Sequence, residues 1–187
     1  MATEATTTQA PAAGTSAIGW KFLSITRIFI GWVFLWAFLD KLLALGYSTG
    51  RDRETGEVDV LGPRAWVNGA HVTEGYLGNA SGPMGDFFQG WASVRLFDWL
   101  FMIGLLGIGL ALILGIGTKI AAISAALMLL LMYLANFDNT NNPFMDDHII
   151  YSTAALGIVW VELGRQDIGL GKWWRKLPVV KKNTWLV

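Results

Sequence analysis

The stretch RLFDWLFMIGLLGIGLALILGIGTKIAAISAALMLLLMYLANF, from Arg95 to Phe137, decides the fold of this chain. It contains two long apolar runs, Arg95–Ile116 and Lys119–Phe137, with almost nothing between them. A helix needs about 20 mostly apolar residues to cross the ~30 Å hydrocarbon layer of a bilayer. Similar runs lie on either side, at Ser24–Leu45 and Asp147–Leu163. The four runs predict an all-α membrane protein, a bundle of four transmembrane helices.

The composition agrees with lipid as the surrounding solvent. Of 187 residues, 53% are hydrophobic and only 15% are charged, whereas soluble domains carry about 25% charged residues. The formal net charge is zero, and we predict a lipid bilayer rather than nucleic acid as the partner. The chain has no cysteine, which excludes disulfides, iron–sulfur clusters and thiol catalysis. With only two histidines besides, we predict no bound metal, haem or flavin.

Lysine and arginine beside the runs predict the orientation in the membrane, because these residues favour the cytoplasmic side. They gather before the first run, at the turn 117–119 and after the last run. We therefore expect a multi-pass protein with both termini cytoplasmic. Residues 1–20 are predicted to be a disordered cytoplasmic tail, 21–170 the membrane domain, and 171–187 a basic, aromatic cytoplasmic tail. Such a tail can bind an anionic leaflet with about 1 kcal/mol per base near the surface.

The connection over residues 46–94 is too long to be idle in a compact protein. Its first part, Ser48–Asp59, is polar and acidic, while its second part, Trp66–Trp91, mixes glycine, proline and aromatic residues. We interpret the connection as an extracytoplasmic cap folded over the outer ends of the helices. A mobile surface loop is the alternative.

Small residues predict where the helices touch. Gly104, Gly107, Ala111 and Gly115 fall on one stripe of the second run. Small side chains let helix backbones approach closely where lipid provides no hydrophobic drive for association. We expect this stripe to be a helix–helix contact.

Charged residues inside membrane segments are costly and usually functional. Near the inner surface, Arg27 and Glu162 are predicted to form an ion pair that locks the first run to the fourth. Near the outer surface we expect a dense polar cluster, for which structural and functional roles both stay open. Its members are Asp40, Lys41, Arg95, Asp98, Asn136, Asp138, Asp146, Asp147 and His148.

The acidic pair Asp146 and Asp147 precedes the fourth run and allows two interpretations. A metal site is one, but the spacing fits no calcium-binding loop. Carboxylates at the start of a helix cap free N–H groups and meet the positive end of the helix dipole. Helix capping is therefore the prediction, and no metal site is assigned.

Over about residues 26–174, the chain shows an Arg27-x-x-x-Gly31-Trp32 motif leading to DKL at 40–42, GIGTK at 115–119 and GRQDIGL at 164–170. These motifs resemble those of the DoxX/DoxD family of small four-helix bacterial and archaeal membrane proteins. WVNG at 66–69, GP at 82–83, NP at 142–143 and DDHIIY at 146–151 are more similar to the DoxD branch of thiosulfate:quinone oxidoreductases. The resemblance implies a prokaryotic plasma membrane protein.

The resemblance also implies a function, as a membrane subunit of a quinone-linked oxidoreductase acting on a reduced sulfur anion such as thiosulfate. Quinone is then the electron acceptor, and a second protein subunit is expected. In this interpretation, basic side chains bind the anion, Trp36 lines an apolar quinone slot, and three groups exchange protons. The anion binders are Lys41, Arg95 and Arg64, and the proton-exchanging residues are Asp40, His148 and Tyr151. The alternative is a non-enzymatic membrane scaffold or accessory subunit of a redox or respiratory complex.

Overall fold

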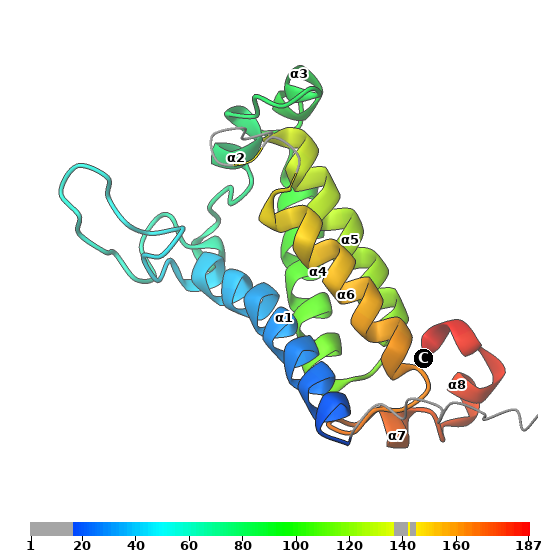
Figure 1. Ribbon diagram of the computed structural model, residues 1–187. Coiled ribbons are helices and arrows are strands. Elements are labelled where there is room, and N and C mark those ends of the chain that lie inside the picture. The colour runs from blue at the N-terminus through cyan, green and yellow to red at the C-terminus, as the bar shows by residue number, and fades with distance from the viewer. Residues whose placement is uncertain (1–16, 137–141, 143–144) are drawn as a thin grey trace, which may run out of the picture.

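The computed structural model describes residues 17–136, 142 and 145–187, and regular secondary structure there is helical. The longest elements are α1, α4, α5 and α6 (Figure 1). Short helices lie in the long connection and after α6. In chain order the elements are α1 Ala17–Leu43, η1 Trp66–Asn68, α2 Glu74–Gly78, α3 Gly85–Gln89, α4 Arg95–Leu114, α5 Thr118–Ala135, α6 Asp147–Glu162, α7 Gly171–Trp174, α8 Pro178–Lys182 and η2 Thr184–Leu186.

The four long helices pack in a ring. Helix α1 lies against α4 and α6, and α5 lies against the same two helices on the other side. In Figure 1, α4, α5 and α6 run alongside one another while α1 crosses them obliquely. Their shared core is built from buried apolar side chains, including Phe34, Met102, Leu112, Ala122 and Val159.

Three of these helices are long and apolar enough to cross a membrane: α1, α4 and α5. Helices α4 and α5 keep within two residues of the predicted runs, whereas α1 begins at Ala17, seven residues before the predicted Ser24. Helix α6 occupies the fourth predicted run, but it has 16 residues. At 1.5 Å per residue it is about 24 Å long, which is shorter than the ~30 Å hydrocarbon layer. The structure therefore has three candidate membrane spans and a shorter fourth helix packed among them.

The predicted boundary of the N-terminal tail is corrected by the structure. Helix α1 begins at Ala17, so that residues 17–20 belong to the helix and not to a disordered tail. The sequence Ala17-Ile18-Gly19-Trp20 is apolar and continues the run that follows it. The rest of the predicted tail, residues 1–16, lies outside the described residues.

Helices α1 and α4 pack closely at Gly31 of α1 and Gly109 of α4. A Cβ atom at Gly109 would lie 2.8 Å from the backbone nitrogen of Leu35, and one at Gly31 would lie 3.0 Å from the carbonyl oxygen of Gly109. A Cβ at Gly107 would meet nothing within 4 Å. Gly107 of the predicted contact stripe therefore faces open space, whereas a Cβ at Gly104 of the same stripe would meet the side chain of Met128 on α5. The contact with α1 lies on another face of α4, at Gly109.

The crossing of α1 and α4 gives a first prediction. Gly109→Leu should lower the free energy of unfolding by about 1–3 kcal/mol, because the new side chain must push against the backbone of α1. Gly107→Leu is the matched control, since it makes the same chemical change on the same helix into open space. Unfolding in detergent, followed by circular dichroism, measures both. Equal destabilisation by the two variants would contradict this packing.

The second half of the long connection covers the ends of α4 and α5. Gly82 N–H donates to the carbonyl of Ala135 over 2.8 Å, and the Tyr76 hydroxyl donates to the carbonyl of Met132 over 2.9 Å. Burial there raises the pKa of the Tyr76 hydroxyl, so that it stays a donor. Phe88 and Ala80 form a small second core with Ala135. In contrast, the cyan segment after α1 projects away from the helices in Figure 1.

The segment after α6 is docked against the other end of the helices. Leu170 N–H donates to the carbonyl of Leu114 at the end of α4 over 2.7 Å, and Val180 is buried. Lys119 at the start of α5 donates from its Nζ to the carbonyl of Thr184 over 2.8 Å. The predicted tail 171–187 is thus a folded foot beneath α4 and α5.

Candidate functional site

A buried acid–histidine pair stands at the start of α4. Asp98 lies in the first turn of this helix and is 0% exposed. Its Oδ1 accepts hydrogen bonds from the backbone N–H and the hydroxyl of Thr73, over 2.9 and 2.8 Å. Its Oδ2 lies 2.8 Å from Nδ1 of His71. A proton on Nδ1 makes that contact a hydrogen bond and gives both buried atoms the partner that they otherwise lack.

The geometry assigns different roles to the two ring nitrogens of His71. A carboxylate beside Nδ1 favours the tautomer that carries its proton there, which leaves Nε2 as the acceptor in the neutral ring. The His71 side chain is 32% exposed, whereas that of Asp98 is fully enclosed. The pair therefore combines a fixed, buried carboxylate with an accessible imidazole whose Nε2 is left for a ligand.

Arg95 belongs to the same site. Its Nη1 donates to the carbonyls of Gly69 and Ala70 over 2.8 and 3.2 Å, immediately before His71 in the chain. Trp99 follows Asp98 on α4, and its ring lies 4.7 Å from that of Trp66, edge to face. We call His71, Thr73, Arg95 and Asp98 the His71 site. Trp99 lies on α4, the helix that carries Asp98, and Trp66 lies on the connection that carries His71.

This site was not predicted from the sequence. Asp98 was assigned to the outer polar cluster together with His148, and no role was assigned to His71. The fold brings His71 to α4 because residues 66–73 turn back over the helix, with Trp66 and Val72 packed on the main core. A signal was present, since an acid in the first turn of an apolar helix needs a buried partner.

Asp40 and Lys41 are bound to the turn that follows α1. Asp40 is buried, and its carboxylate accepts from the N–H groups of Tyr47 and Ser48 over 3.1 and 2.9 Å and from the Ser48 hydroxyl over 2.6 Å. Lys41 donates to the same hydroxyl over 3.0 Å. The predicted proton exchanger Asp40 thus fixes the chain reversal at the end of α1. Trp36 packs edge-on against the ring of Tyr47, with centroids 5.1 Å apart.

His148 and Tyr151 lie at the beginning of α6. Asp146 is the N-cap of this helix, and its carboxylate accepts from the N–H of His148 over 2.5 Å. The capping role predicted for Asp146 is confirmed. The same carboxylate lies 2.7 Å from Nδ1 of His148. Tyr151 is 41% exposed on the helix surface. Among the described residues, no hydrogen bond or ion pair connects His148 with Asp40 or Lys41.

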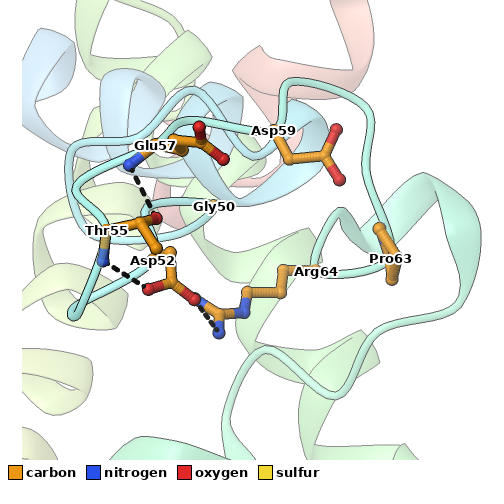
Figure 2. A pocket seen from close by; sticks show the side chains of 7 residues that line it. All are labelled: Gly50, Asp52, Thr55, Glu57, Asp59, Pro63 and Arg64. Atoms are coloured by element: carbon orange, nitrogen blue, oxygen red, sulfur yellow. Dashed lines mark hydrogen bonds and ion pairs between the residues drawn. The ribbon is translucent and has the colours of Figure 1, made fainter.

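Arg64 lines a hollow of about 370 Å³ in the projecting segment after α1 (Figure 2). Its guanidinium lies 3.7 Å from the carboxylate of Asp52 and donates to the carbonyl of Arg51 over 2.7 Å. Hydrogen bonds from the N–H groups of Thr55 and Glu54 lower the pKa of Asp52, which keeps it ionised. Since Asp52, Glu57 and Asp59 also line this hollow (Figure 2), it is unfavourable for the anion that Arg64 was predicted to bind.

Arg27 and Glu162 meet in the interior. Nε of Arg27 lies 2.6 Å from Oε2 of Glu162, and both side chains are almost completely buried. The guanidinium also donates to the carbonyl of Leu112, in the last turn of α4, and over 2.6 Å to that of Ile168. The Ser24 hydroxyl donates to the other oxygen of Glu162 over 2.5 Å. One cation thereby connects α1, α4, α6 and the segment after α6.

Arg165 lies apart from the Arg27–Glu162 pair. It forms an exposed ion pair with Asp167 over 2.8 Å. This pairing lowers the pKa of Asp167. Arg165 also lies over the ring of Trp20, 5.6 Å from its centroid. The start of α1 and the segment after α6 therefore lie together at one end of the molecule.

Comparison of the chain with protein-family models, curated proteins and solved structures yields no match. The function is therefore inferred from the site geometry and from the motifs of the sequence.

Proposed function

We propose that this chain is a four-span membrane subunit of a quinone-linked oxidoreductase, and that the His71 site exchanges protons with the quinone. The observation that carries the proposal is the buried Asp98 carboxylate holding an accessible imidazole at the beginning of a candidate membrane span. Neutral quinones reside in the bilayer, and their carbonyl groups need a hydrogen-bond donor at the membrane depth where the quinone ring binds. Leu96, Trp99 and Leu100 expose an apolar face of α4 beside the site, which a quinone can approach from lipid.

The chemistry requires such a group. Joining two thiosulfate ions through a new S–S bond releases two electrons, and reducing a quinone to a quinol takes up two electrons and two protons. Nε2 of His71, once protonated, can donate to a quinone oxygen, and Asp98 stabilises the imidazolium that precedes the transfer. Arg95 is the nearest base, and its exposed guanidinium is the best candidate to hold the sulfur anion. The electrons pass directly between the bound substrates or through a second subunit.

The membrane arrangement follows from the same contacts. The pairing of Trp20 with Arg165 and of Arg27 with Ile168 supports both ends of the chain lying on one side. Basic residues around the foot favour the cytoplasm for that side. We place the connection 46–94 on the outer side of a prokaryotic plasma membrane as a cap. Helix α6 completes the four spans with its polar ends, Asp147 and Glu162, near the two surfaces.

A quinone assay tests the proposal. The protein, purified with any subunit that stays bound and placed in lipid nanodiscs, should form quinol from a short-chain quinone in the presence of thiosulfate. Absorbance at the quinone band gives the rate. Sulfate replaces thiosulfate in the control, because it offers the same charge without electrons to donate. A preparation that neither binds nor reduces the quinone would contradict the proposal.

The non-enzymatic scaffold remains a second proposal because one observation favours it. The charged groups Arg27, Glu162 and Asp40 are used entirely in joining helices or closing a turn. A scaffold in a redox complex needs no more than that. Co-purification of a stable partner, together with unchanged activity of the complex after replacement of His71, would favour the scaffold.

A further inference from the structure

We propose that a groove between α5, α6 and η2 binds one anionic phospholipid, through its headgroup and the adjoining part of an acyl chain. The groove has a volume of about 400 Å³. Its walls are Ile120 and Ile123 from α5, and Trp160 and Leu163 from α6. Ile123 and Trp160 are each 52% exposed, so that an acyl chain in the groove can lie against both side chains.

The groove changes from polar to apolar along the helix. Lys119 and Thr184 line its end at the beginning of α5. Ile123 stands one turn further along the same face as Lys119, because residues four apart in a helix are neighbours. Trp185 borders the groove near its polar end. A charged head beside an acyl chain has the same order of polarity, whereas a water-soluble ligand does not.

The positive charge of Lys119, at the polar end of the groove, favours an anionic ligand. Lys119 Nζ donates one hydrogen bond, to the carbonyl of Thr184 over 2.8 Å. An ammonium group has three donors, so that it can still donate to a phosphate oxygen. The segment from the end of α6 into the foot is strongly basic, because residues 162–182 contain six bases and two acids. Both acids are already engaged, Glu162 with Arg27 and Asp167 with Arg165. A zwitterionic lipid would add a positive group to this environment, and an anionic lipid would not.

Native mass spectrometry tests this inference directly. The protein is released from mixed vesicles of phosphatidylglycerol and phosphatidylcholine in equal amounts, and the bound lipids are counted. We expect one phosphatidylglycerol to be retained in preference to phosphatidylcholine. Lys119→Met should weaken its retention about fivefold, the effect of one base near an anionic headgroup. Lys182→Met is the matched control, because it removes a base outside the groove lining and should change retention little.

A second variant separates the groove from the charge. Ile123→Trp fills the apolar wall and leaves Lys119 in place, and it should abolish the retained lipid while circular dichroism stays helical. Equal retention of the two lipids, equal effects of the two lysine variants, or a protein dimer without lipid would overturn the inference. None of these readouts uses quinone turnover, so that the lipid proposal and the His71 proposal fail independently.

Discussion

Replacing Arg27 by methionine is expected to lower the free energy of unfolding by about 3–5 kcal/mol, the usual cost of breaking a buried ion pair. The change leaves Glu162 charged and 3% exposed, with the Ser24 hydroxyl as its neighbour. It also removes the donor to Leu112 and Ile168. Helices α1, α4 and α6 and the segment after α6 thereby lose a side chain that contacts all of them. Unfolding in mixed micelles with increasing dodecyl sulfate, followed by circular dichroism, measures the loss.

Two further variants show whether the charge is the cause. Arg165→Met removes an arginine from an exposed pair, and it should lower the free energy of unfolding far less than Arg27→Met does. The double variant Arg27→Met/Glu162→Met removes both buried charges together and should recover part of the loss, because no isolated charge is left in the interior. If the double variant is as unstable as the sum of its single changes, the buried pair is not a coupled unit.

His71→Asn is expected to reduce thiosulfate-dependent quinol formation by about 10²–10⁴-fold, the range that general acid–base catalysis contributes. The Asn side chain places an N–H near the position of Nδ1, so that the hydrogen bond to Asp98 is kept. It has no second ring nitrogen and cannot exchange a proton. The cap should therefore stay in place while the chemistry stops, and steady-state rates in nanodiscs measure the effect.

The control for His71 is the other histidine. His148→Asn likewise keeps an N–H near the carboxylate of Asp146, at the start of α6. Because nothing connects His148 with the His71 site in the described structure, this variant should retain the activity of the unaltered protein. A loss of activity in His148→Asn with none in His71→Asn would return the proton-exchanging role to the residue that the sequence analysis selected.

The helices could be predicted because apolar runs of membrane length have few alternatives. All four predicted runs contain a long helix, and Asp146 begins α6 as its cap. The helix-packing face was harder to predict, because glycine is frequent on all sides of α4 and the sequence alone does not show which side α1 covers. Gly109 was missed for that reason.

The candidate site was hidden because it depends on the path of the irregular loop. His71 and Asp98 are separated by 27 positions, and no periodic pattern fixes the fold of residues 66–73. Asp40 shows the opposite case: its partners lie seven and eight residues further along, in the turn that it closes. The density of charged residues in the sequence thus indicated where polar side chains gather, but not which of them contact one another.

Nitrogen NMR of the His71 ring tests the central claim most directly. With labelled histidine in lipid nanodiscs at neutral pH, and with His148→Asn to leave one signal, Nδ1 should carry the proton and Nε2 should be free. Adding a short-chain quinone or its quinol should shift the Nε2 resonance and leave Nδ1 attached to Asp98. A proton on Nε2 alone, or a ring signal unchanged at saturating quinone, would contradict the proposal that this pair serves a quinone.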